Sequence, residues 1–399
     1  MSEYNSHKQK SHPFLGETSL KGEIMRRIIS FILSIICIFI LCACGEIESS
    51  VPSPDKETDF VTEEAETSQP IEETEPQIII PNDEMIADKT EPEPTKFDIK
   101  LTFVGDVMLA SYKNQTTSKS FNEYANNQEQ TYFFEKVYDI FSNDDFTTVN
   151  LENVFTDKNL KEKEKDHDPA YWYRSQTSNV GILTSSSIEG VSLANNHTYD
   201  YGQTGYNDTV TTVSEANLEY GTNEHTFYYE KDGFVIAVIC HGLWGEWQAD
   251  AIINRIKEAE ENSDYQIVFY HGGTERLHTP ETWKQRASRK LIDNGADLVI
   301  GNHPHVLQPI EIYNDKQIIY SLGNFCFGGS SRPENRTIIY QMTLTVDIET
   351  MSIKEEVSNI IPCYVYTGDR NNYQPTPIEL QEEIDKVIAF MNGECDLPY

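Results

Sequence analysis

The sequence predicts an α/β protein with a largely parallel sheet. Six short apolar runs between residues 98 and 301 each end in polar or metal-ligating side chains. Two segments between the last three runs have helical spacing, and strands that alternate with helices of this length indicate βαβ units. Apolar residues make up 38% of the 399-residue chain and aromatic residues 11%, which suffices for a sizeable core and excludes wholesale disorder.

The predicted strands carry polar side chains to one edge of the sheet. In the first strand Ile99, Leu101 and Phe103 alternate with polar residues, as a half-buried strand requires. Ligands bind at the carboxyl ends of strands in parallel sheets, so residues up to about 200 positions apart should converge there. The predicted strands are 98–104, 146–150, 190–193, 234–239, 266–270 and 297–300, and the polar residues after them include Asp106, Glu152, Asn196, His197, His271, His303 and His305.

Helices are predicted at 250–263 and at 279–294. In the second, Thr279 is the expected N-cap and Pro280 the first helical residue. The remaining elements are strands at 318–322, 337–346 and 360–366 and a last helix at 378–391. These late strands have no helix between them, which indicates hairpins that add a second sheet or an antiparallel edge.

Charge and cysteine content exclude several classes of function. The formal net charge is −34, which argues against electrostatic capture of nucleic acid, so no nucleic-acid partner is predicted. Residues 97–399 alone carry 23 basic and 46 acidic side chains, so the body of the protein is acidic too. The seven cysteines are scattered and form no CxxC pair, which argues against a thiolate zinc site or a disulfide scaffold.

The amino-terminal quarter is predicted to be an anchor followed by a spacer. Residues 25–44 combine two arginines, an apolar run and the ending Leu-Cys-Ala-Cys, which resembles a bacterial lipoprotein signal with Cys44 as the lipidated residue. Residues 1–24 fit no part of that signal and are expected to be a spurious upstream extension. The alternative is a retained transmembrane anchor, although the apolar run is short of the usual span of about 20 residues. Residues 45–96 hold mostly acidic and small residues and predict an extended, disordered linker. Either anchor places 97–399 on the extracytoplasmic face of the membrane.

The residue types at the strand ends predict a metal site. Carboxylates, an amide and histidines suit a divalent cation such as Mn, Fe or Zn. Two ions bridged by one carboxylate would activate a water and clamp a phosphoryl or acyl oxygen, with His197 as proton donor. A lone strand-end aspartate such as Asp106 is more often a turn former or helix cap. The pair His303 and His305 flanks Pro304, which restricts the backbone and favours a site.

The order of motifs resembles the CapA/PgsA family of poly-γ-glutamate capsule proteins. That family is similar to the calcineurin-like metallophosphoesterases, which implies a four-layer α/β/β/α sandwich of two mixed sheets flanked by helices over 97–399. The resemblance covers about residues 98–345. The motifs are Gly105-Asp-Val-Met-Leu109, Asn150-Leu-Glu152, Leu193-Ala-Asn-Asn-His197 with Asp200-Tyr-Gly202, His271-Gly-Gly-Thr-Glu275, Gly295 to Glu311 around His303-Pro-His305, and Tyr320-Ser-Leu-Gly-Asn-Phe325.

The resemblance implies a role for each candidate residue. The implied metal ligands are Asp106, Glu152, Asn196, His271, His303 and His305, the implied general acid is His197, and Glu275 is a further ligand or a base. Three positions depart from the pattern. Met108 replaces a histidine ligand, Glu152 is longer than the usual aspartate, and Asn302 stands where relatives commonly have histidine. A thioether binds hard ions poorly, so one metal position is expected to be weaker.

The family implies a membrane-tethered protein of poly-γ-glutamate synthesis or export, with other capsule-synthesis membrane subunits as partners. Two other interpretations stay open. One is an extracellular metal-dependent phosphoesterase or amide hydrolase that acts on another envelope substrate. The other is a non-catalytic binding module whose strand-end residues are structural.

Overall fold

The computed structural model describes residues 95–399, apart from 113–114, 116–119, 167–168 and 329–334. The predictions for 1–24, for the anchor at 25–44 and for nearly all of the linker at 45–96 therefore lie outside the described residues. In the part of the chain that is described, no helix has the length and hydropathy needed to cross a bilayer.

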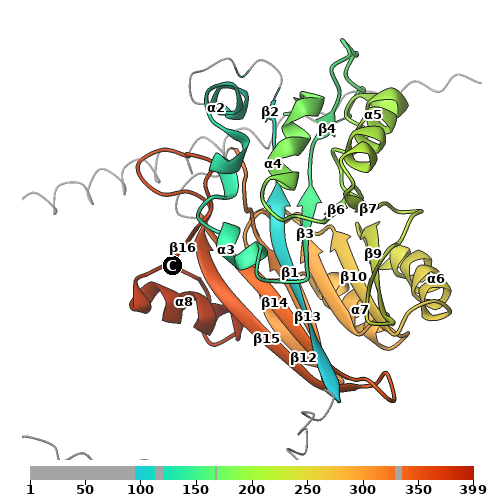
Figure 1. Cartoon of the computed structure of the whole chain (residues 1–399). Coiled ribbons are helices and arrows are strands. Elements are labelled where there is room, and N and C mark those ends of the chain that lie inside the picture. Colours follow the sequence, from blue (N-terminus) through green and yellow to red (C-terminus); the bar gives the residue numbers. More distant parts are fainter. Residues whose placement is uncertain (1–94, 113–114, 116–119, 167–168, 329–334) are drawn as a thin grey trace, which may run out of the picture. The chain divides into compact units, whose positions relative to one another are not determined.

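The described residues form two large mixed sheets, so the strands after residue 301 do not merely add an edge to one largely parallel sheet (Figure 1). In the first sheet β1 pairs parallel with β3 and antiparallel with β14, and in the second β9, β10, β11 and β13 are parallel to one another. Within the described residues the first sheet has the order β16 (Thr376–Pro377), β15 (Ile353–Tyr364), β14 (Arg336–Asp347), β1 (Lys96–Val107), β3 (Phe146–Leu151), β6 (Gly190–Ser192) and β7 (Glu219–Gly221). The second has the order β12 (Leu307–Tyr313), β13 (Lys316–Leu322), β11 (Leu298–Asn302), β10 (Tyr265–His271), β9 (Phe234–Gly242) and β8 (Phe227–Lys231).

A small third sheet joins three short strands. Its strands are β2 (Ser111–Tyr112), β5 (Tyr173–Ser175) and β4 (Val154–Phe155).

The inner faces of the two large sheets pack on each other and form the main core. Leu101 and Phe103 of β1 meet Ile267 and Phe269 of β10 in one buried cluster, and the rings of Phe103 and Phe269 lie 5.8 Å apart. In the second sheet the central strands β9, β10 and β11 are buried on both faces, which explains why they are apolar almost throughout.

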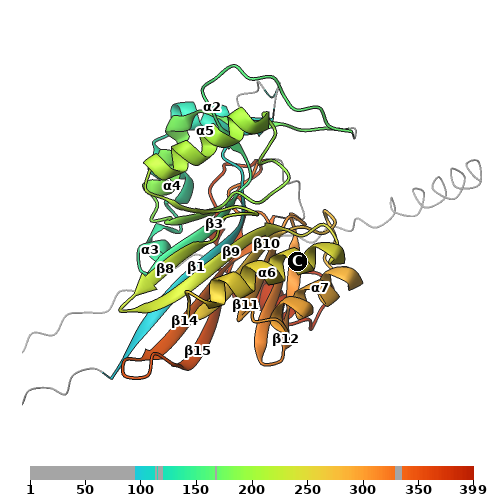
Figure 2. The ribbon, with the colours of Figure 1, turned by 90° about the vertical axis from the view of Figure 1, so that its right-hand side faces the viewer.

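Helices cover the outer face of each sheet, so the fold is the predicted four-layer α/β/β/α sandwich (Figure 2). The helices α6 (Ala249–Glu260) and α7 (Thr282–Ile292) pack on the second sheet. The first sheet is covered by α2 (Phe121–Asn127), the 3₁₀ turn Gln130–Phe134, α3 (Tyr138–Phe141), α4 (Gly181–Thr184) and α5 (Gly202–Glu215). The last helix, α8 (Gln381–Met391), packs against β12, the edge strand of the second sheet, and against β15 of the first.

Several predicted boundaries are wrong. Helix α6 ends at Glu260 instead of 263, and helix α8 begins at Gln381 instead of 378. Helix α7 begins at Thr282 with Glu281 as its N-cap, and Thr279 and Pro280 precede it. The chain is held outside the helix there because His278 Nδ1 lies 2.9 Å from the Leu307 carbonyl oxygen of β12. The strand predicted at 360–366 begins earlier, at Ile353. Its first half is exposed and carries charged side chains, so no apolar alternation marks it.

Candidate metal centre

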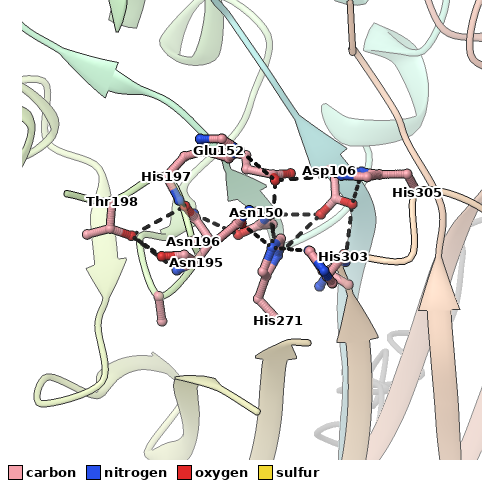
Figure 3. A network of polar contacts seen from close by, with 12 residues as sticks. Asp106, Asn150, Glu152, Asn195, Asn196, His197, Thr198, His271, His303 and His305 are labelled. Carbon is pink, nitrogen blue, oxygen red and sulfur yellow. Dashed lines mark hydrogen bonds and ion pairs between the residues drawn. The ribbon is translucent and has the colours of Figure 1, made fainter. Parts of the chain in front are cut away.

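The predicted site residues meet where the carboxyl ends of both large sheets come together (Figure 3). Asp106 ends β1 and Glu152 follows β3, while His271 ends β10. The loop after β6 supplies Asn196 and His197, and the loop after β11 supplies His303 and His305. The convergence that strand-end chemistry predicts is therefore present, and it spans two facing sheets instead of the rim of one.

One group of ligand atoms surrounds His271. Its Nε2 lies 2.8 Å from Asn196 Oδ1, 3.1 Å from His303 Nδ1 and 3.7 Å from Glu152 Oε1. Metal–ligand bonds to nitrogen and oxygen are about 2.0–2.2 Å long, so atoms at these separations can all reach one ion.

A second group shares Glu152 with the first. His305 Nδ1 lies 3.1 Å from Asp106 Oδ2, and His305 Nε2 lies 3.8 Å from Glu152 Oε1. Glu275 is exposed, and one of its oxygens lies within 4.8 Å of ligand atoms of His303 and His305. The arrangement therefore offers two neighbouring cation positions with Glu152 common to both.

The carboxylate of Glu152 is the strongest structural sign that the residues fit a cation. The side chain is fully buried, and neither of its oxygens has a hydrogen-bond partner among the described residues. Burial raises the pKa of Glu152 well above its ordinary value, and the carboxylate of Asp106 raises it further. Buried carboxylates are ordinarily paired or bound to metal, and a divalent ion would satisfy this one.

The histidines are mostly held in the neutral form that binds metals. Burial lowers the pKa of His271 and of His303 well below the ordinary value, and neighbouring histidines add to the effect. Burial opposes protonation of His305 as well, but the carboxylates of Glu152 and Asp106 outweigh it and raise the pKa. The backbone φ angles of His303 and His305 are 95° and 58°, which lie in a region that residues other than glycine rarely adopt. This loop is thus strained where it presents both imidazoles.

His197 is held by a carboxylate, as a proton donor would be. Its Nδ1 lies 2.8 Å from Asp200 Oδ2, and its Nε2 faces Glu152 Oε1 at 3.9 Å. Lys165 Nζ lies 2.7 Å from the other oxygen of Asp200. Burial lowers the pKa of His197 while Asp200 opposes that shift. The ring is therefore oriented with Nε2 toward the candidate metal positions.

Comparison with known proteins places the chain in a family. The model of the bacterial capsule synthesis protein family PGA_cap matches residues 100–231 and 219–329. The chain belongs to this family.

Relatives agree with the family match. The PGA biosynthesis protein CapA of Bacillus subtilis is 30% identical over 252 residues, which cover 57% of this chain and 63% of that protein. The capsule biosynthesis protein CapA of Bacillus anthracis is 26% identical over 64% of this chain and 68% of its own length. The chain thus spans about two thirds of the length of these relatives.

Solved structures show weaker likeness. A hypothetical protein from Thermus thermophilus matches with a TM-score of 0.42 and 13% identity over 66% of this chain and 99% of its own. A phosphatase from Mycoplasma pneumoniae matches with a TM-score of 0.40 and 15% identity over 67% of this chain and 94% of its own. Such low scores say nothing about activity.

The departures from the family pattern have structural counterparts. Met108 is fully buried in a small apolar cluster with Phe327 and Val365, so its thioether is packed among hydrocarbon. Asn302 is buried, and its amide nitrogen lies 3.5 Å from the Tyr270 carbonyl oxygen of the neighbouring strand. Asp106, Glu152 and His305 are thus the candidate ligands at one position, whereas Asn196 joins Glu152, His271 and His303 at the other.

Sequence reasoning missed several amide side chains that support the site. Asn150 Nδ2 donates to Asp106 Oδ1 at 2.8 Å and lies 3.0 Å from His271 Nδ1. Asn195 Nδ2 lies 3.2 Å from Asn150 Oδ1, and Asn324 Oδ1 lies 2.9 Å from His305 Nδ1. All three stand inside the quoted motifs, which was the available signal. Nothing in their spacing distinguishes a supporting amide from a turn residue.

Proposed function

We propose that this chain is a surface-anchored protein of capsule synthesis or export whose metal centre binds or processes a poly-γ-glutamate polymer. The observation that carries the proposal is the buried carboxylate of Glu152, which has no hydrogen-bond partner among the described residues and lies within a cluster of ligand atoms, in a chain of the PGA_cap family. Relatives whose names refer to PGA biosynthesis and capsule biosynthesis support the choice of polymer.

The negative charge of the protein favours a bound cation as the group that receives an anionic polymer. The residues from 97 onward carry twice as many acidic as basic side chains, so an anionic polymer is repelled by most of the surface. A bound divalent ion, which we take to be Mn, Fe or Zn, supplies local positive charge and polarises a carbonyl or phosphoryl oxygen.

The residues around the centre then have distinct tasks. Asp106, Glu152 and His305 hold one position, while Asn196, His271 and His303 with Glu152 hold the other. His197, oriented by Asp200 through Nδ1, takes up a proton at Nε2 and then passes it to a leaving group. Glu275 stands on an exposed loop beside His303 and His305, where it serves as an additional ligand or as a base.

The anchor and the spacer complete the proposal. A lipid on Cys44 holds the protein at the extracytoplasmic face of the membrane, and the acidic residues 45–96 carry the folded body 97–399 away from it. There the body would meet the polymer and other membrane subunits of capsule synthesis.

A metal-dependent phosphoesterase or amide hydrolase of another envelope substrate is the second candidate. The contact of His197 with Asp200 favours it, because a carboxylate-oriented histidine beside two cation positions is an arrangement suited to hydrolysis. The third interpretation, a non-catalytic binding module, treats the strand-end residues as structural and requires neither the cation nor proton transfer by His197.

One experiment separates these functions. The purified chain is incubated with poly-γ-glutamate and with a panel of phosphoesters, with Mn²⁺ or with EDTA, and both polymer binding and product formation are measured. If the metal centre binds poly-γ-glutamate as proposed, the chain should bind the polymer only with metal present, and His271→Ala should abolish this binding. His225→Ala, which changes an exposed histidine outside the site, serves as the matched control.

The outcomes differ clearly. Cleavage of the polymer that His197→Ala lowers by about 100-fold or more supports catalysis on it, since general acid–base groups contribute about 10²–10⁴-fold. Fast phosphoester turnover without polymer binding favours the second candidate. Polymer binding that EDTA leaves unchanged contradicts a metal-based role.

A further inference from the structure

We infer that Asn324 is a positioning residue that orients His305, and that this contact allows the position formed by Asp106, Glu152 and His305 to hold an ion. The inference rests on the proposed metal centre. It concerns the position that the family resemblance implies to be the weaker one, because Met108 stands where that resemblance implies a histidine ligand.

The backbone fixes Asn324 beside Asp106. Asp106 N–H donates to the Gly323 carbonyl at 2.9 Å, and Phe325 N–H donates to the Asp106 carbonyl at 2.8 Å. Residues 106 and 324 thus form a parallel bridge between the end of β1 and the segment after β13. Asn324 itself is buried, with an exposed fraction of 3%. Its side chain is therefore placed by the main chain of both sheets.

The contacts of His305 define which ring nitrogen keeps its hydrogen when an ion binds. Nδ1 lies 2.9 Å from Asn324 Oδ1 and 3.1 Å from Asp106 Oδ2. A carboxylate oxygen at this distance accepts, so Nδ1 is the donor whichever way the amide is turned. Nε2 is then the atom that can bind an ion, and it faces Glu152 Oε1 at 3.8 Å.

Asn324 provides an acceptor that is not one of the candidate metal ligands. Metal-binding histidines usually donate their other ring N–H to such a group, which fixes the tautomer and the ring orientation. Phe327 packs against the ring of His305 at 4.8 Å between centroids, and His303 lies at 5.6 Å. These rings limit tilting, whereas Asn324 defines the hydrogen-bond direction.

The test measures Mn²⁺ binding by the full-length chain. Wild type, Asn324→Ala and Asn324→Asp are titrated by calorimetry, and electron paramagnetic resonance follows the signal of magnetically coupled Mn²⁺ pairs. Asn143→Ala, which removes an exposed amide outside the site, is the matched control. Asn324→Ser repeats the titration if the alanine variant does not fold.

We expect two Mn²⁺ ions per wild-type chain. Asn324→Ala should weaken the second ion by about 10–100-fold and remove the coupled signal while the first ion stays bound, since loss of such a supporting contact costs about that factor. Asn324→Asp, which retains an acceptor, should restore the second ion. Three results would overturn this inference without touching the proposed function. They are unchanged binding of the second ion in Asn324→Ala, failure of Asn324→Asp to restore that ion, and a wild-type chain that binds a single ion. A wild-type chain that binds no metal overturns the proposed function itself.

Discussion

At the scale of single residues, Glu152 links the sequence prediction to the chemistry of the site. The carboxylate is buried, it has no hydrogen-bond partner among the described residues, and it is common to both cation positions. In the metal-free protein it is therefore a source of instability, and under the proposed function it would be a ligand once metal binds.

We predict that Glu152→Gln stabilises the metal-free protein and removes its response to metal. The pKa of Glu152 is raised in the folded state, so the unfavourable contribution of the wild-type carboxyl grows as pH rises above about 4.5. In EDTA the variant should match wild type near pH 5 and exceed it by about 1–3 kcal/mol at pH 8.

Urea unfolding at both pH values measures this difference. With Mn²⁺ at about 100 times its dissociation constant, wild type should gain about 2.7 kcal/mol and the variant much less. A variant that is less stable than wild type in EDTA at pH 8 would show that Glu152 has a structural partner.

The candidate ligands could be predicted because their residue types are uncommon directly after apolar runs. His271, His303 and Glu152 needed only the rule that strand ends converge. The supporting role of Asn150 and Asn324 could not be predicted in this way. Asparagine is frequent in turns for local reasons, and its contact with a ligand depends on two sheets meeting.

At the scale of elements, the crossing of β1 with the segment after β13 decides whether the site assembles. A Cβ atom on Gly105 would lie 1.8 Å from the Gly323 carbonyl oxygen. Asp106 follows immediately and is bonded to Gly323 through its backbone. The absence of a side chain at Gly105 is therefore what allows Asp106 to approach the second sheet.

We predict that Gly105→Ala destabilises the protein by about 3 kcal/mol or more and abolishes metal binding, because the backbone cannot relieve the overlap without moving Asp106. Gly202→Ala is the control, since its Cβ would meet no atom within 4 Å and only its φ of 65° is unfavourable. That change should cost about 1 kcal/mol and leave metal binding intact. Equal effects of the two variants on stability and metal binding would contradict the steric argument.

The apolar pattern of the sequence predicts some elements closely and others poorly. The central strands β3 and β10 lie within about two residues of the predicted ranges, because buried apolar runs mark them clearly. The start of α7 was wrong because a tertiary contact at His278 overrides the local capping signal. The early part of β15 was missed because it is an exposed strand with polar residues.

At the scale of the whole molecule, the site exists because two sheets present their carboxyl ends to each other. Asp106 and Glu152 come from the first sheet, and His271 and His303 come from the second. All the strands before these residues have the same apolar pattern, so their division between two sheets was not visible in the strand pattern. It follows from long-range pairing such as β1 with β14, and from the family resemblance that implied two sheets.

The central claim is that these residues bind a divalent cation, and metal content tests it most directly. The purified chain is loaded with Mn²⁺, Fe²⁺ or Zn²⁺, exchanged into metal-free buffer and analysed by inductively coupled plasma mass spectrometry beside a variant with both His271→Ala and His303→Ala. The account predicts one or two ions per wild-type chain and far fewer in the double variant. Equal metal content in the two proteins would contradict it.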